Sequence, residues 1–183
     1  MRRILLVAAA AAAMLVWAGT APSGANALDG QLQPVVSPIP REVVGFFGGE
    51  APGTIIIRTS ERRLYFVLPD HQALRYGVGV GRPGFTWAGV TRIAYKREWP
   101  DWTPPSQMLR RRPDLPRHME GGVDNPLGAR AMYLARTLFR IHGSNEPDTI
   151  GHAVSSGCIR MTNDDVIDLY GRARVGTRVI VTR

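Results

Sequence analysis

The chain has 183 residues, a formal net charge of +8 at pH 7 and a single cysteine. One cysteine excludes an internal disulfide, so stability must come from a hydrophobic core, which a chain of this length can bury. The basic charge favours anionic partners.

The first residues have the pattern of a secretory signal peptide. Arg2 and Arg3 precede an alanine-rich apolar run over residues 4–16, and residues 25–27 offer a small-x-small cleavage site. The run is short for a membrane span, which needs ~20 apolar residues, although a retained anchor is the alternative. We predict that residues 1–27 are a signal peptide and that the mature chain is exported to the periplasm or cell wall. We expect no stable membrane insertion after cleavage and no nucleic-acid partner.

Cleavage after Ala27 leaves 156 residues (183 − 27), which suits one domain. Residues 28–52 contain several prolines and a Gly48-Gly49 pair without a clear period, which predicts an extended N-terminal arm. We expect four apolar residues to pack this arm onto the domain: Val43, Val44, Phe46 and Phe47.

From residue 53 onward, short β-branched and aromatic runs alternate with turn residues, which is typical of antiparallel sheet. The expected strands cover residues 54–58, 64–68, 73–80 and 177–181, with a hairpin over 129–134 and 137–142. One helix is expected, capped by Thr162 and ended by Gly171. Residues 81–125 are rich in proline and predicted to be irregular. They form either a functional loop or a loop with a purely structural role that packs on the sheet.

The chemistry is concentrated before that helix. Cys158 follows Gly157 and lies four residues before Thr162, while His142 ends a predicted strand 16 residues earlier. A thiolate is the attacking species, so a nucleophilic cysteine needs a base or a positive charge nearby. His142 can take the thiol proton, and Arg160 adds positive potential. Gly157 leaves space for substrate, and the amides of Gly157 and Cys158 could hold a developing oxyanion. The pattern indicates cysteine acyl transfer.

Two alternatives remain at this point, an inert buried cysteine and a zinc site. Cys158, His142 and His152 supply at most three ligands without a close pair, so we predict no metal. We interpret His152 as a loop residue, and His71 and His118 as surface residues. Ser155 and Ser156 are expected to make hydrogen bonds in the loop.

The sequence resembles the L,D-transpeptidase family with the YkuD-type catalytic domain. The resemblance rests on His142-Gly143 and on the spaced Ser-Ser-Gly-Cys-Ile-Arg of residues 155–160, with support from residues 102–105 and 125–128. It covers roughly residues 53–183, the predicted catalytic domain. It implies a mainly β fold, sandwich-like or barrel-like, with one short helix after the cysteine. The family often has histidine where this chain has Ser156.

The resemblance implies that Cys158 is the nucleophile and His142 the base, with Gly157 at the reacting centre. Arg160, Ser156 and Gly143 are the expected substrate contacts. The implied reaction is attack on a peptidoglycan tetrapeptide stem, release of D-alanine and transfer of the acyl group to an amine, without a cofactor. The acceptor could be a second stem peptide, an outer-membrane lipoprotein or water. A non-catalytic peptidoglycan-binding module is the alternative to an enzyme.

Overall fold

The computed structural model describes residues 26–33 and 35–183. All but the last two residues of the predicted signal peptide lie outside this range. Over the part that is described, none of the helices combines the length and the apolar character that a membrane span requires.

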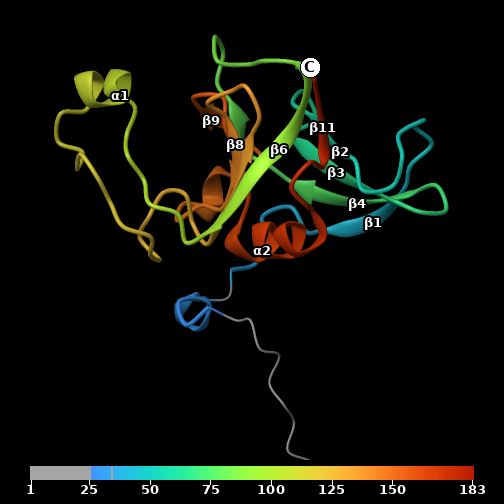
Figure 1. Cartoon of the computed structure of the whole chain (residues 1–183), viewed down its shortest axis with the longest axis horizontal. Coiled ribbons are helices and arrows are strands. Elements are labelled where there is room, and N and C mark those ends of the chain that lie inside the picture. The colour runs from blue at the N-terminus through green and yellow to red at the C-terminus, as the bar shows by residue number, and fades with distance from the viewer. Residues whose placement is uncertain (1–25, 34) are drawn as a thin grey trace, which may run out of the picture.

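Nine strands form one curled, half-barrel sheet, which confirms the mainly β prediction (Figure 1). Their order is β1-β4-β3-β2-β11-β6-β7-β8-β10, and β5 and β9 form a small separate pair. In chain order the strands are β1 (Glu42–Gly45), β2 (Ile55–Arg58), β3 (Arg63–Leu68), β4 (Gln72–Gly77), β5 (Val80–Gly81), β6 (Gly89–Glu98), β7 (Arg130–Leu134), β8 (Arg140–His142), β9 (Ala153–Ser155), β10 (Ile159–Arg160) and β11 (Arg178–Thr182).

The sheet is mixed, whereas the sequence suggested an antiparallel one. β11 pairs with β2 in parallel, and β10 pairs with β8 in parallel. The predicted hairpin is confirmed, since β7 and β8 pair in antiparallel fashion. The parallel pairing of β8 and β10 requires a crossover, and residues 143–158 provide it. This crossover brings distant parts of the chain to one edge of the sheet.

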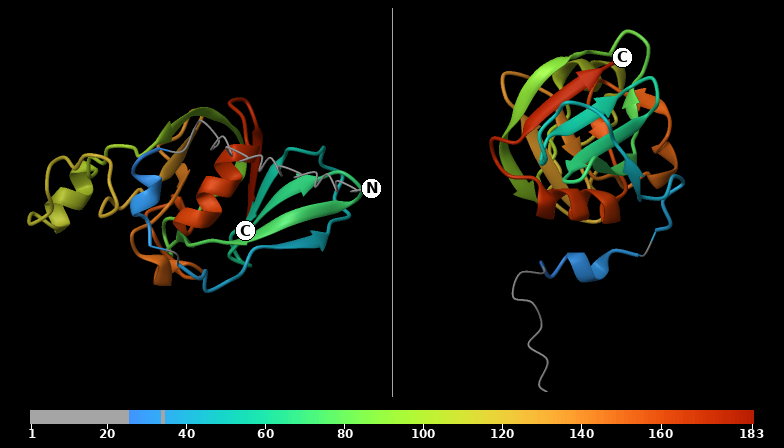
Figure 2. Two further views of the ribbon diagram at one scale, coloured as in Figure 1. Left: turned by 90° about the horizontal axis from the view of Figure 1, so that it is seen from below. Right: turned by 90° about the vertical axis from the view of Figure 1, so that its right-hand side faces the viewer.

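The helix α2 (Asn163–Arg172) lies along one side of the curled sheet and packs against β7 (Figure 2). Its predicted cap is confirmed, because the amide of Asp165 donates to Thr162 Oγ1 at 3.3 Å. The helix ends at Arg172, one residue beyond the expected Gly171. Val166 and Leu169 are fully buried in the main core, together with apolar residues from most of the strands. The segment before α2, which contains Cys158, is therefore anchored by a helix whose first turns are buried in the core.

The prediction that residues 81–125 are irregular was wrong for about a third of that segment. β6 (Gly89–Glu98) lies inside the sheet between β11 and β7, and the short helix α1 (Ser106–Arg111) stands away from the strands (Figures 1 and 2). The sequence of β6 is mostly polar because only Ile93 is buried in it. A strand with one buried residue lacks the alternation of apolar and polar residues by which strands are predicted from sequence.

The N-terminal arm is more ordered than expected. It contains a short 3₁₀ helix, Asp29–Gln31, and β1, which pairs with β4 at one edge of the sheet. Phe46 is buried and Val44 half-buried, but Val43 is 56% exposed and Phe47 is 88% exposed, so the packing expected of those two was wrong.

Candidate active site

His142 is the last residue of β8, and its side chain is buried, with 4% exposed. Its Nδ1 lies 2.6 Å from the carbonyl oxygen of Gly143. Since a carbonyl oxygen can only accept a hydrogen bond, Nδ1 carries the hydrogen and Nε2 keeps its lone pair. The imidazole is thereby held in the tautomer that can take a proton at Nε2.

Burial lowers the pKa of His142 to about 3, and the positive charge of Arg160 acts in the same direction. Hydrogen bonding to the carbonyl of Gly143 opposes this shift. The imidazole is therefore neutral at physiological pH, which a general base requires.

Cys158 precedes β10 and shares a face of the sheet with His142. In the parallel pairing of β8 with β10, Ile159 lies opposite Ile141 and Arg160 opposite His142. Extending that register by one residue places Cys158 beside Arg140. Alternate residues of a strand share a face, so positions 158 and 160 and positions 140 and 142 face the same side. The predicted base thus ends β8, and the predicted nucleophile, 16 residues later, directly precedes the neighbouring strand β10.

The thiol of Cys158 is held mainly in its protonated form. Burial raises its pKa, while the positive charge of Arg140, the backbone amide of Arg140 and the charge of Arg160 pull the pKa down. The burial effect is the largest. Thiol and imidazole are therefore both neutral at physiological pH.

Ser155 closes the turn that carries the cysteine. Its hydroxyl donates to the carbonyl oxygen of Cys158 at 2.6 Å and accepts from the amide of Gly157 at 3.0 Å. This confirms the hydrogen bonding expected of Ser155, although the residue ends β9 and does not lie in a loop. It also differs from the expectation for Gly157, because the amide that was expected to hold an oxyanion already donates to Ser155.

Gly157 is needed here for packing. Its φ is +111°, and a Cβ at this position would lie 2.3 Å from the ring of Phe139. Phe139 stacks on Trp87 with ring centroids 4.9 Å apart, and Trp87 Nε1 donates to the carbonyl oxygen of Gly157 at 2.9 Å. The space that was expected to admit substrate is filled by Phe139.

The three expected substrate contacts have different surroundings. Arg160 Nη1 lies 2.8 Å from a carboxylate oxygen of Glu146, and its side chain is 21% exposed. Ser156 Oγ accepts from Arg82 Nη1 at 3.3 Å. The amide of Gly143 donates to the carbonyl oxygen of Arg130, and its own carbonyl oxygen accepts from Nδ1 of His142, so Gly143 orients the imidazole.

The other histidines lie apart from this pair. His152 is exposed, and His71 stacks on the exposed ring of Phe47. His118 Nδ1 lies 3.5 Å from the hydroxyl of Thr103 on the surface. Among residues 26–33 and 35–183, no three histidine, cysteine or acidic side chains are grouped to hold a metal ion.

Sequence reasoning missed Arg140, Trp87 and Phe139 as parts of the site. Arg140 could have been found, because it lies two residues before His142 on a predicted strand and so shares its face. Its Nε is buried without a hydrogen-bond partner among the described residues. Trp87 and Phe139 gave no local signal, because their contact depends on the folded position of Gly157.

The family model of the YkuD L,D-transpeptidase catalytic domain matches residues 52–181. The chain belongs to this family. "Probable L,D-transpeptidase ErfK/SrfK" of Escherichia coli (strain K12) is 40% identical over 134 residues, which are 68% of this chain and 42% of that protein. The chain thus matches about two-fifths of the length of this relative.

Two solved structures resemble the fold. One is titled a "Probable carnitine operon oxidoreductase caia from Brucella melitensis", with 43% identity, a TM-score of 0.53 and coverage of 83% of this chain and 97% of that one. The other is the catalytic domain of the Enterococcus faecium L,D-transpeptidase acylated by ertapenem, with 21% identity, a TM-score of 0.54 and coverage of 70% and 95%. The name of the Brucella protein describes that protein alone, and the second likeness concerns the fold.

Proposed function

We propose that this protein is an exported L,D-transpeptidase that acts on peptidoglycan stem peptides through a thioester on Cys158. One structural observation is the main support for this proposal. A buried, neutral His142, with Nδ1 committed to Gly143, lies on the strand that pairs with the one beginning just after Cys158. The names of its family relatives support the same reaction class.

In the first half-reaction, the sulfur of Cys158 attacks the carbonyl carbon of diaminopimelate in a tetrapeptide stem. His142 Nε2 takes the thiol proton, and the amide of Cys158 faces the developing oxyanion. The C–N bond to the terminal D-alanine breaks, and His142 returns the proton to the leaving amine. A thioester and free D-alanine are the products.

In the second half-reaction, an amine attacks the thioester and gives a new amide. His142 takes a proton from the amine, and the sulfur of Cys158 leaves and is reprotonated. A second stem peptide as acceptor gives a crosslink. A protein acceptor would attach an outer-membrane lipoprotein to the wall, and water would give hydrolysis. Without Arg2 and Arg3 of the proposed signal peptide, the formal charge is +6 (8 − 2), which suits an anionic wall polymer in each case.

The test uses residues 28–183, the proposed mature chain, which includes the arm and the proposed catalytic domain of residues 53–183. Incubation with disaccharide-tetrapeptide muropeptides should release D-alanine and give crosslinked products, identified by mass. The Cys158→Ala variant should be folded and give none. Substantial crosslinking by that variant would exclude Cys158 as the nucleophile.

A second measurement separates an enzyme from a non-catalytic wall-binding module. Ertapenem acylates the Enterococcus faecium domain named above. We expect it to add one acyl group to the mature chain, detected by intact mass, and none to Cys158→Ala. A chain that binds peptidoglycan but takes up no ertapenem and releases no D-alanine would be a binding module.

A further inference from the structure

Four residues form a row that runs across neighbouring strands away from the catalytic cysteine. Tyr95 of β6 pairs with Tyr133 of β7, and Tyr133 pairs with Arg140 of β8. The register of β8 and β10 places Cys158 next in the row. The row therefore starts at the nucleophile and ends at β6.

The side chains of this row are stacked on one another. The guanidinium carbon of Arg140 lies 5.3 Å from the ring centroid of Tyr133, and the rings of Tyr133 and Tyr95 are 4.1 Å apart with 13° between their planes. One face of Tyr133 meets Arg140 and the other meets Tyr95. The outer face of the Tyr95 ring is then the exposed end of the stack, and Tyr95 is 47% exposed.

Beyond Tyr95 the sheet has a free edge. β11 pairs with β6 only over Gly89–Arg92, and the backbone of Ile93 bonds to the loop before β11. From Tyr95 to Glu98, β6 is paired only with β7 among the described strands. A groove of about 700 Å³ lies along this edge, within the range of about 300–1,000 Å³ that small-molecule sites occupy.

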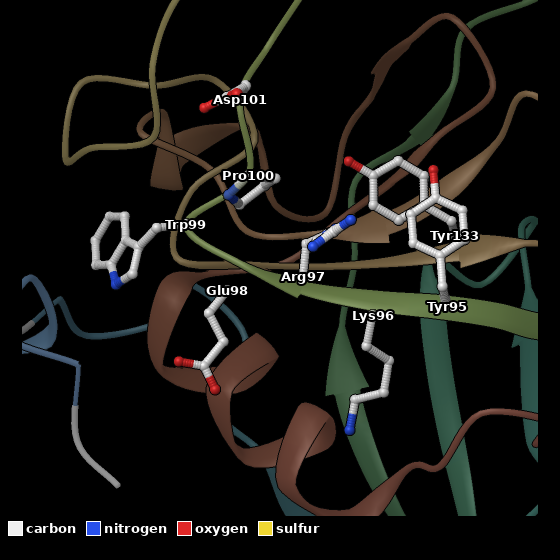
Figure 3. Close-up of a pocket in the computed structure, with 8 residues that line it drawn as sticks. All are labelled: Tyr95, Lys96, Arg97, Glu98, Trp99, Pro100, Asp101 and Tyr133. Carbon is white, nitrogen blue, oxygen red and sulfur yellow. The ribbon is translucent and has the colours of Figure 1, made fainter.

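The groove offers an aromatic face with charged groups around it. Figure 3 shows Tyr95, Tyr133 and Arg97 on one side of β6, with Asp101 above them, and Lys96 and Glu98 on the other side. A sugar ring matches this combination, because its C–H face packs on an aromatic ring while its hydroxyl groups bond to planar charged groups at the rim. Arg97 and Asp101 are exposed, and Asp101 accepts from the amide of Gly121 at 3.2 Å, so both can also bond to ligand hydroxyl groups, which a purely apolar ligand does not have.

The spacing relates the groove to the reacting cysteine. Three strand intervals separate Cys158 from Tyr95, which is about 14 Å at the usual spacing of neighbouring strands. The acylated diaminopimelate is the third residue of its stem, and three extended residues span about 10–11 Å. The γ-linkage of the second residue adds to this length. A stem that lies along the row would bring its sugar to Tyr95.

The geometry points to a glycan subsite in this groove: the sugar that carries the acyl-donor stem stacks on Tyr95 and is hydrogen-bonded by Arg97 and Asp101. This inference rests on the proposed function, which supplies the donor. It makes the enzyme selective for stems still attached to the glycan strand.

The kinetic test compares a disaccharide-tetrapeptide with the same tetrapeptide without sugar, as kcat/KM for D-alanine release. The wild-type protein should prefer the sugar-bearing donor about fivefold, in the range that one aromatic contact supplies. Tyr95→Ala should lose this preference while Tyr95→Phe keeps it, and ertapenem acylation should be unchanged in both. Phe47→Ala removes an exposed ring far along the sheet and should keep the preference.

Equal use of the two donors by the wild-type protein, or an unchanged preference in Tyr95→Ala, would overturn the inference. A binding measurement decides the matter even if no turnover occurs. The peptide-free disaccharide of N-acetylglucosamine and N-acetylmuramic acid is titrated into the Cys158→Ala protein, and amide NMR shifts are recorded. Saturable shifts at residues 95–101 that vanish in Cys158→Ala/Tyr95→Ala support the subsite, and their absence overturns it.

Discussion

The Nδ1 atom of His142 lies 2.6 Å from the carbonyl oxygen of Gly143, the next residue in the chain. The orientation of the imidazole is therefore set by the backbone of the next residue, with no carboxylate needed to fix the tautomer. Because the carbonyl is neutral, it does little to raise the proton affinity of the ring. Burial dominates and keeps the pKa low.

His142→Ala should lower the rate of acylation by ertapenem by about 10²–10⁴-fold, the range that general-base catalysis supplies. His152→Ala is the matched control, because His152 is exposed in the same crossover and should keep nearly full activity. Single-turnover acylation followed by intact mass measures both. A larger loss in His152→Ala than in His142→Ala would show that His152 is the base.

The local placement of the two candidate catalytic residues could be predicted from the sequence. Cys158 beside a capped helix start, and His142 at a strand end, were recognisable because each carries a signal within a few residues. The contact of Gly157 with Phe139 and the partner of Arg160 could not be predicted, since they depend on packing between distant segments. The sequence did not predict β6 because its residues do not alternate between apolar and polar. They form a strand because they pair with β7 and β11, which are distant in the sequence.

Alkylation of Cys158 should have a pH midpoint above that of an ordinary thiol, about 8.5. A raised pKa means less thiolate at neutral pH, so reaction with iodoacetamide at pH 7 should be slower in the folded protein than in urea. Arg140→Gln removes a charge that lowers the thiol pKa and should move the midpoint further up. A midpoint below pH 8 in the folded wild-type protein would instead indicate a preformed thiolate, and proton transfer before attack.

Gly157→Ala should destabilise the fold and reduce acylation. The residue has φ of +111°, where side chains are strained by about 1–2 kcal/mol, and the new Cβ would meet Phe139. Gly171→Ala is the matched control, because no atom lies within 4 Å of its Cβ position in α2 and alanine favours a helix by about 0.5–1 kcal/mol. Urea unfolding measures both free energies. Equal stability of the two variants would mean that position 157 can accommodate a side chain.

Asp29→Asn should loosen the arm from the domain. Both oxygens of Asp29 accept from Arg130, at 2.9 and 2.6 Å, and the side chain of Arg130 is only 5% exposed. Loss of this charge-assisted pair should cost about 1–2 kcal/mol in the free energy of unfolding at pH 7, after allowance for the partial exposure of Asp29. Asp114→Asn is the control, since its pair with Arg112 is exposed and its loss should be undetectable.

The pH dependence gives an independent check on Asp29. Its pairing with Arg130 lowers its folded pKa below the unfolded value of about 3.9. The group is ionised in both states above that value, so its contribution is complete there and is lost as pH falls through the folded pKa. The difference in unfolding free energy between wild type and Asp29→Asn should shrink below pH 4. A non-zero difference that stays constant down to pH 2 would mean that it does not come from the charge of Asp29.

Ser156 occupies the position where the resemblance to the family leads us to expect histidine, and here its hydroxyl accepts from Arg82 at 3.3 Å. If His142 is the base, Ser156→Ala should keep ertapenem acylation within about tenfold of wild type, and Ser156→His should change it modestly. Arg82→Gln tests whether the hydroxyl acts through Arg82. In that case the two single variants and the double variant should show the same small loss, because they remove one shared interaction.

A loss of about 10²–10⁴-fold in folded Ser156→Ala would give the serine a direct chemical role, since that range belongs to general-base catalysis. A large gain in Ser156→His has the opposite meaning. It would show that the histidine of the family pattern completes a site that this chain leaves weak, and it would favour a wall-binding role for the natural protein. Acylation by ertapenem distinguishes these outcomes because it reports the first chemical step alone, before any acceptor amine takes part.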